Sequence, residues 1–242
     1  MSIVISQSMY FPWPGLLEQV RLADKFVHYD DVQFSRGFFN RVQIKTKDGL
    51  RWLTVPLKKH AQIAKINQIE IDESKPWRDA HLRDLLASYR RAPFVDDLIG
   101  ILDSVYSLHH ATLADVSRES ILALAGYFGI RDDKLFLKSS DLDVGGHSSE
   151  RLLSICLGQN ETTYITGHGA RNYLNHELFE SKGVHVRYMD YEMRPYPQLF
   201  GEFCPFVSAL DLVANCGRRG VEFLCSNHVP WRKFVKGIDH AV

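Results

Sequence analysis

A β-α-β unit at the start of the chain is the sequence feature that most constrains the fold. Residues 3–5 (Ile-Val-Ile) predict a short buried strand, and residues 25–29 predict a second one. Between them, Leu16, Leu17, Val20 and Ala23 repeat with the period of a helix. Because such crossovers are right-handed and join parallel strands, the turn at residues 7–15 should lie at the carboxyl edge of the sheet, where open α/β folds bind ligands.

The next segments predict additions to this unit. Residues 41–45 and 52–56 flank Asp48-Gly49, a pair typical of β-hairpins, and residues 66–71 alternate as an edge strand would. From Trp77 to about Phe128 the apolar spacing becomes helical.

The β-α pattern then resumes, with strands expected at residues 134–137, 163–166 and 184–188 and a helix near 149–158. We therefore expect a single α/β domain over residues 1–242, with a mostly parallel sheet and flanking helices. An N-terminal β-hairpin is added to it, and residues 76–130 form a helical insert.

The charge and cysteine content exclude some classes of protein. The 29 basic residues balance the 29 acidic ones, so the chain lacks the positive field of a nucleic-acid-binding protein. No apolar run approaches the ~20 residues of a membrane-spanning helix, so we expect a protein that is not integral to a membrane. The four cysteines form no C-x-x-C pair and no apolar leader opens the chain, which favours a cytoplasmic protein.

The turn at residues 7–15 is the richest candidate site. It brings the amide of Gln7, the phenol of Tyr10 and the indole of Trp13 to the mouth of a helix, so we expect these three residues to bind substrate. The alternative is that its aromatic residues only seal the end of the sheet. Gln7 favours a functional turn, since a seal does not need an amide.

Further polar residues are expected near the same edge. Asp30 follows the second strand and is a candidate base, as is His81, which lies four residues after Trp77 on a predicted helix. Gln33, Asn40 and Arg41 are candidate substrate ligands, Arg41 as a clamp on a phosphate or carboxylate. The competing interpretations are a capping carboxylate, a structural helical histidine and a surface arginine paired with an acid.

A glycine-rich turn follows the strand at residues 163–166. Gly167, His168 and Gly169 precede a predicted helix that contains Tyr173, and we expect these four residues to contact substrate, the turn by taking a phosphate. A tight β-α turn that needs unusual dihedrals would explain the glycines equally well. Despite 11 histidines, no metal-ligand spacing and no G-x-S-x-G motif occurs, so we predict neither a metal site nor a serine triad.

Over nearly its whole length the chain resembles the WbqC-like family of bacterial surface polysaccharide (O-antigen) clusters. The resemblance rests on Gln7 with residues 10–15, on residues 26–34, Asn40-Arg41, 52–56, Trp77 with His81, 89–93, 167–170 with Tyr173-Leu174, and 196–198 with Ser208, Asp211 and Asn215. The family usually has proline after the first glutamine, where this chain has Ser8.

This resemblance implies work on nucleotide-linked sugars, such as attaching an aminoacyl or acyl group to an amino sugar. We expect no tightly bound cofactor. An acyl thioester, carried by coenzyme A or an acyl carrier protein, or ATP would act as co-substrate.

A fainter similarity, to pantothenate synthetase and related adenylate-forming enzymes, lies in the first turn and in the strand that leads to Val32-Gln33-Phe34. Those enzymes carry an H-x-G-H element, but the corresponding residues here are Trp13-Pro14-Gly15-Leu16, which lack both histidines. The fold alone therefore does not license adenylation.

Two other functions compete with the amide-forming transferase. A non-catalytic scaffold that recruits sugar-modifying enzymes would use the aromatic turn as an interface anchor. A glycosyltransferase ranks lowest, because the usual D-x-D metal site is missing.

Overall fold

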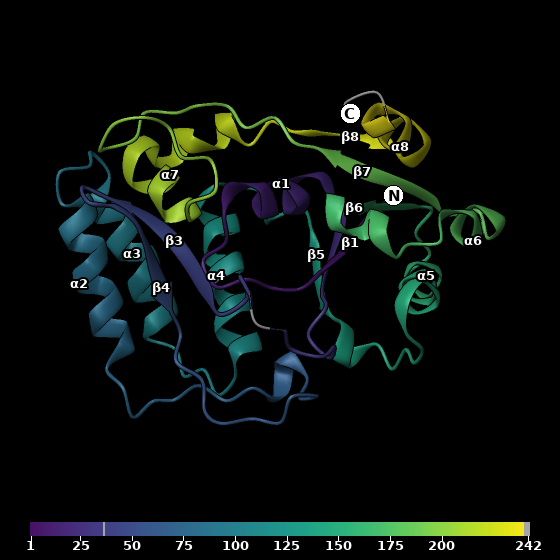
Figure 1. Cartoon of the computed structure of the whole chain (residues 1–242), viewed down its shortest axis with the longest axis horizontal. Helices are drawn as coiled ribbons and strands as arrows, with labels where there is room; N and C mark the ends of the chain where they lie inside the picture. The colour runs from purple at the N-terminus through teal and green to yellow at the C-terminus, as the bar shows by residue number, and fades with distance from the viewer. Residues whose placement is uncertain (36, 240–242) are drawn as a thin grey trace.

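A computed structural model describes residues 1–35 and 37–239 of the 242-residue chain, and its centre is a mostly parallel sheet (Figure 1). Within the described residues, six strands lie in the order β5-β2-β1-β6-β7-β8, and only β8 runs antiparallel to its neighbour. The strands are β1 (Ser2–Ser6), β2 (Lys25–His28), β5 (Leu135–Lys138), β6 (Thr163–Thr166), β7 (His185–Asp190) and β8 (Asn227–Pro230). The predicted α/β fold with its parallel sheet is confirmed.

Helices cover both faces of this sheet. On one face, Val4 and Phe26 belong to a cluster with α1 and α4, and on the other Ile3, Ile5 and Val27 belong to a cluster with α5 and α6. This alternation follows from the two-residue period of a strand buried on both sides. The helices are α1 (Pro14–Leu22), α4 (Leu113–Tyr127), α5 (Ser148–Gly158), α6 (His176–Ser181), α7 (Ala209–Cys216) and α8 (Trp231–Asp239).

The strand order reverses between β1 and β6. The chain moves outward from β1 through β2 to β5, then returns to the other side of β1 for β6 and β7. In a doubly wound sheet this switch point leaves a crevice at the carboxyl ends of the strands, and ligands bind there. The β1-α1 turn and the β6-α6 connection both open into it.

The predicted hairpin, β3 (Arg41–Thr46) with β4 (Gly49–Thr54), forms a separate two-stranded sheet (Figure 1). α2 (Trp77–Tyr89) and α3 (Val95–Tyr106) follow it and pack together, while α4 returns to the main sheet against α1. Of the segment expected as a helical insert, 76–130, α4 is thus the crossover helix that leads to β5.

The edge strand expected at residues 66–71 is wrong. Ile66–Gln68 form a 3₁₀ turn instead, and only isolated bridges join Leu57 to Ile71 and Glu70 to Thr112. The alternating apolar residues Ile66, Ile69 and Ile71 are all buried in the core beneath the hairpin and α4. The alternation of apolar and polar residues therefore reflects the burial of one side of this segment and not a position in a sheet.

Candidate functional site

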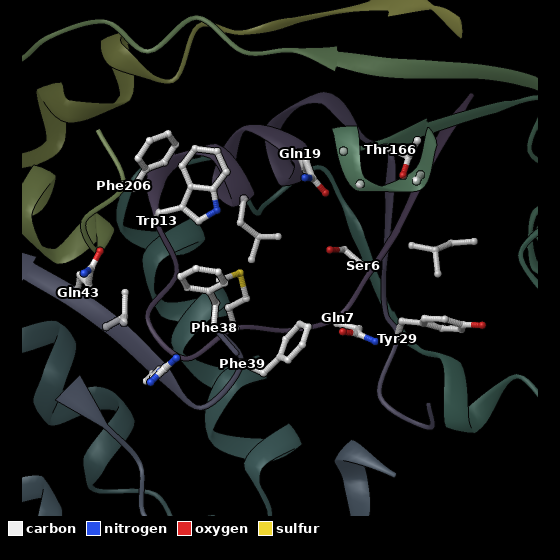
Figure 2. A pocket seen from close by; sticks show the side chains of 18 of the residues that line it. Ser6, Gln7, Trp13, Gln19, Tyr29, Phe38, Phe39, Gln43, Thr166 and Phe206 are labelled. Atoms are coloured by element: carbon white, nitrogen blue, oxygen red, sulfur yellow. The ribbon is translucent and has the colours of Figure 1, made fainter. Parts of the chain in front are cut away.

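A pocket of about 930 Å³ occupies the crevice at the switch point of the sheet. Its floor contains Ser6 and Gln7 at the end of β1, Gln19 of α1, and Thr166 with Gly167 at the end of β6 (Figure 2). The volume lies toward the upper end of the ~300–1,000 Å³ range of small-molecule sites.

One wall of the pocket is aromatic. Figure 2 shows Trp13, Phe38 and Phe206 gathered on the side away from Ser6 and Thr166. With Trp52 these side chains form what we call the aromatic rim. Trp13 packs on Phe206 with ring centroids 5.6 Å apart, and Phe38 packs on Trp52 at 5.8 Å. Phe38 and Phe206 are 60 % and 58 % exposed, so their faces are accessible from solvent.

The geometry of Trp13 depends on Gly15. The indole folds back over α1 so closely that a Cβ on Gly15 would lie 2.0 Å from its Cη2. Pro14 begins the helix, where its missing N–H removes no helical hydrogen bond. The Trp-Pro-Gly sequence thus fixes one residue of the aromatic rim locally.

The turn that carries Trp13 is held by distant segments. Phe11 has a φ of 38°, a left-handed conformation that costs a non-glycine residue free energy. Its N–H donates to Ser120 Oγ of α4 at 2.9 Å, and its carbonyl accepts from Ser208 Oγ at 2.8 Å. Tertiary hydrogen bonds therefore stabilise a backbone that the local sequence disfavours.

The polar residues of the pocket lining differ in charge and in how far their hydrogen-bonding groups are already paired. Arg41 is the charged residue among the described lining side chains; its guanidinium lies 4.5 Å from the Trp52 ring centroid, and Nε donates to the Gly37 carbonyl at 3.0 Å. Gln19 donates to Tyr191 Oη at 2.8 Å. The Ser6 hydroxyl and the Gln7 amide make no hydrogen bond with another described residue, so they can bind a ligand. Burial raises the pKa of Tyr29, which lines the far side.

The structure brings part of the predicted site together. Of the residues expected to bind substrate, the pocket is lined by Gln7, Trp13, Arg41, Gly167, Gly169 and Tyr173. The pocket is also lined by polar and aromatic residues that were not predicted from the sequence: Ser6, Gln19, Tyr29, Phe38, Phe39, Gln43, Trp52, Thr166 and Phe206. Ser6 and Thr166 are the last residues of two adjacent strands, and this position could have predicted them as site residues. No feature of the sequence predicts that the hairpin residues or Phe206 line the pocket.

Tyr10 and His81 lie elsewhere, in a buried cluster beside the hairpin that also contains Tyr106 and Trp77. His81 Nδ1 is 2.9 Å from Tyr10 Oη, and Nε2 is 3.2 Å from the Thr54 carbonyl oxygen. Tyr10 Oη is 2.5 Å from Tyr106 Oη. Since a carbonyl only accepts, Nε2 carries the proton, and Nδ1 accepts from Tyr10.

Burial sets the protonation states in this cluster. It lowers the pKa of His81 to about 4 and raises that of Tyr10, so both groups are neutral near pH 7. Neither residue lines the pocket. The geometry thus places both side chains in hydrogen bonds within the protein and outside this pocket, and their catalytic and binding roles stay predictions.

Asp30 is also absent from the pocket lining. Its Oδ1 accepts from the Ser140 N–H at 3.0 Å, and Oδ2 accepts from the Ser140 hydroxyl at 2.9 Å. The neighbouring Asp31 pairs with Arg151 at 2.5 Å. Burial alone would raise the pKa of Asp31, but hydrogen bonds from Arg151 and Ser139 outweigh it and hold the pKa below its usual value. These carboxylates tie the segment after β2 to the segment after β5 and to α5.

Three further predicted ligands lie off the pocket lining. Gln33 donates to the Gln62 carbonyl at 3.1 Å, and Asn40 donates to the Val55 carbonyl at 3.0 Å. His168 Nε2 lies 2.7 Å from the Met189 carbonyl oxygen, so it donates there. Each side chain holds two backbone segments together, which is the structural alternative to substrate binding.

The described residues contain no group of three His, Cys, Asp or Glu side chains placed to hold a metal ion. Across the same residues, no helix is long and apolar enough to cross a membrane.

Fold and site together define an α/β protein with a large pocket, walled on one side by aromatic residues, at the switch point of a doubly wound sheet. The WbqC-like protein family model matches residues 7–223, and the chain belongs to this family. It is similar to a Mycobacterium tuberculosis protein named "Uncharacterized protein Rv1507c", with 34 % identity over 226 residues that cover 92 % of this chain and 96 % of the relative. No solved structure matches the chain significantly.

Proposed function

We propose that the chain transfers an acyl or aminoacyl group to the amine of a nucleotide-linked amino sugar in surface polysaccharide biosynthesis. The observation that carries the proposal is the pocket at the switch point, which combines an aromatic wall, uncommitted polar groups and one arginine. Aromatic faces suit the planar base and the apolar face of a sugar ring, and a guanidinium suits a diphosphate.

In this proposal the protein accelerates the reaction mainly by holding the two substrates in the reactive orientation. The described lining residues include no carboxylate, imidazole or thiol, so no side chain there is assigned as a strong base. Aminolysis of an acyl thioester needs a neutral amine held against the acyl carbon: the N–C bond forms, the C–S bond breaks, the thiolate departs and the amine proton passes to water. Proximity alone can supply ~7–11 kcal/mol of the barrier in a well-aligned complex.

The apolar walls and Arg41 assist this step. Both disfavour an ammonium ion in the pocket, which increases the fraction of free amine. The donor is an acyl thioester of coenzyme A or of a carrier protein, or an acyl-adenylate made from ATP. Asp30 and His81 have no role in the proton transfer, since both are committed to structural hydrogen bonds.

The test combines product detection with a matched pair of arginine variants. Purified protein is incubated with nucleotide-linked amino sugars, UDP-glucosamine among them, and either acetyl coenzyme A or ATP with glycine, and products are read by mass spectrometry. Arg41→Gln should weaken sugar binding about tenfold, whereas Arg51→Gln, an exposed arginine on the same hairpin that pairs with Asp84 outside the pocket, should not. Neither binding nor a mass-shifted product across the panel would refute the proposal.

The exposure of Phe38 and Phe206 favours a second candidate, a non-catalytic protein that docks a sugar-modifying enzyme over the pocket. In that case Phe38→Ala would abolish co-purification with the partner, and the wild-type protein would bind no nucleotide-linked sugar. Tyr10 and Phe11 cannot serve as the anchors expected from the sequence, because both are fully buried.

A further inference from the structure

A second, smaller pocket of about 330 Å³ lies between α4 and the end of β2 and β5. Its lining includes His28, Phe136, Arg118, Arg131 and Lys138, and it shares no lining residue with the switch-point pocket. Gln7 and Tyr29 line the larger pocket, while Ser8 contacts His28 in the smaller one. The backbone at residues 7–8 and 28–29 therefore separates the two.

Positive charge dominates this pocket. Three cationic side chains and one carboxylate, Asp141, line it, which leaves a formal charge of +2. Lys138 pairs with Asp141 at 3.0 Å, and Arg118 lies 3.3 Å from Glu119. Arg131 makes no ion pair with a described residue, so its guanidinium is free to bind an anion.

His28 contributes an unused hydrogen-bonding atom. The side chain is 1 % exposed, Nδ1 is 2.7 Å from Ser8 Oγ, and the ring stacks on Phe136 at 5.9 Å. Nε2 is buried and has no hydrogen-bond partner among the described residues. A buried polar atom without a partner destabilises the folded protein, and a hydrogen bond to a ligand would relieve that cost.

The neutral imidazole of His28 can still donate one hydrogen bond to an anion. Burial, with a smaller contribution from Arg118, lowers the pKa of His28 to about 3, so the imidazole is neutral near pH 7. If the Ser8 hydroxyl donates to Nδ1, the single ring proton is on Nε2, the ring atom that has no partner among the described residues.

We propose that this pocket binds a phosphoryl group, with His28 Nε2–H donating to one oxygen and the guanidinium of Arg131, supported by Arg118 and Lys138, holding the others. The size suits a phosphate with a small organic group attached, at the low end of ligand-site volumes. Arginine binds phosphate through paired, charge-assisted hydrogen bonds, which a simple point charge does not form. This site is separate from the transferase proposal and does not depend on it.

The test follows His28 directly. ¹⁵N-labelled protein is titrated with inorganic phosphate at constant ionic strength, and the imidazole ¹H–¹⁵N signal of His28, assigned by its loss in His28→Gln, is recorded. We expect a saturable shift at Nε2. A parallel titration with glucose 1-phosphate distinguishes a site for phosphate esters, which would bind the ester more tightly, from a site for free phosphate.

Matched variants distinguish specific phosphate binding in this pocket from non-specific electrostatic attraction to the protein surface. Arg131→Gln should weaken phosphate binding at least tenfold, and Arg118→Gln should weaken it less, because Arg118 already lies beside Glu119. Arg83→Gln removes one charge from an exposed position on α2 and should change nothing. A non-saturating shift, or equal weakening by Arg131→Gln and Arg83→Gln, would overturn the proposal; thermal unfolding checks that each variant is folded.

Discussion

Two aromatic residues of one turn, Tyr10 and Trp13, differ in their surroundings: one is buried in the core and the other lines the pocket. Tyr10 is fully buried, with its hydroxyl between His81 and Tyr106, whereas Trp13 lies over Gly15 and lines the pocket. The buried cluster has its ring hydroxyls and imidazole paired within the protein, while the pocket contains the uncommitted groups of Ser6 and Gln7. Side chains of types common in catalytic sites, such as His81 and Tyr10, can therefore stabilise the fold, while neighbouring residues of the same turn line the pocket.

The largest test of this difference is His81→Ala. The variant removes a buried ring and leaves the Tyr10 hydroxyl without its acceptor, so the free energy of unfolding should fall by about 4 kcal/mol. Urea unfolding measures the loss. Sugar binding by the folded fraction should stay within about twofold of wild type; abolished binding in a protein of normal stability would place His81 at the site after all.

The pH dependence of stability comes next. Since the pKa of His81 is about 4 in the folded protein and ~6.5 unfolded, the unfolded state binds more protons between these values. Its contribution is full above pH ~6.5 and is lost as the pH falls toward 4, on the order of 3 kcal/mol in total.

Glu18, whose pKa burial raises to about 7, acts in the opposite sense, so the effect must be isolated by subtraction. The difference in unfolding free energy between wild type and His81→Gln should shrink as the pH falls from 6.5 to 4. A constant difference would contradict the buried neutral histidine.

Gly15→Ala tests the other region. The new methyl group would collide with the Trp13 indole, so Trp13 must leave the aromatic rim. We expect sugar binding to weaken about tenfold, which corresponds to ~1.4 kcal/mol. Gly100→Ala, a helical glycine with open space around it, is the matched control and should leave binding unchanged. Equal effects of the two substitutions would show that Trp13 does not contact the ligand.

The smallest expected effect belongs to the exposed end of the aromatic rim. Phe206→Ala removes one face of the pocket but leaves Trp13 supported by Tyr191, at a ring-centroid distance of 5.2 Å. Binding should weaken about threefold, or ~0.7 kcal/mol, as measured by isothermal titration. Phe200→Ala, an exposed phenylalanine outside the lining, should have no effect.

The sheet could be predicted because its signals are local. Residues 3–5 and 25–29 carry strand patterns around one amphipathic helix, and this spacing already placed Gln7 and Trp13 at the carboxyl edge. The hairpin followed from Asp48-Gly49, and Gly49 does adopt a φ of 109°.

The composition of the pocket could not be predicted, because tertiary packing sets it. Trp52 and Phe206 lie on segments far from β1 in the sequence, and no local pattern says which way they point. His81 was misplaced for the same reason: helix periodicity shows that α2 has a buried face but not that this face meets the hairpin instead of the sheet edge.

The left-handed backbone at Phe11 has a consequence for synthesis on the ribosome. Its partners, Ser120 and Ser208, leave the exit tunnel long after residues 7–15, as does Ala209, whose N–H donates to the Pro12 carbonyl. A nascent chain that ends before residue 208 can pair β1 with β2 but lacks the Ser208 hydroxyl and the Ala209 N–H that hold the carbonyls of Phe11 and Pro12. A chain truncated near residue 205 would therefore keep most of the sheet strands but lack Phe206 and the hydrogen bonds that hold the turn before Trp13.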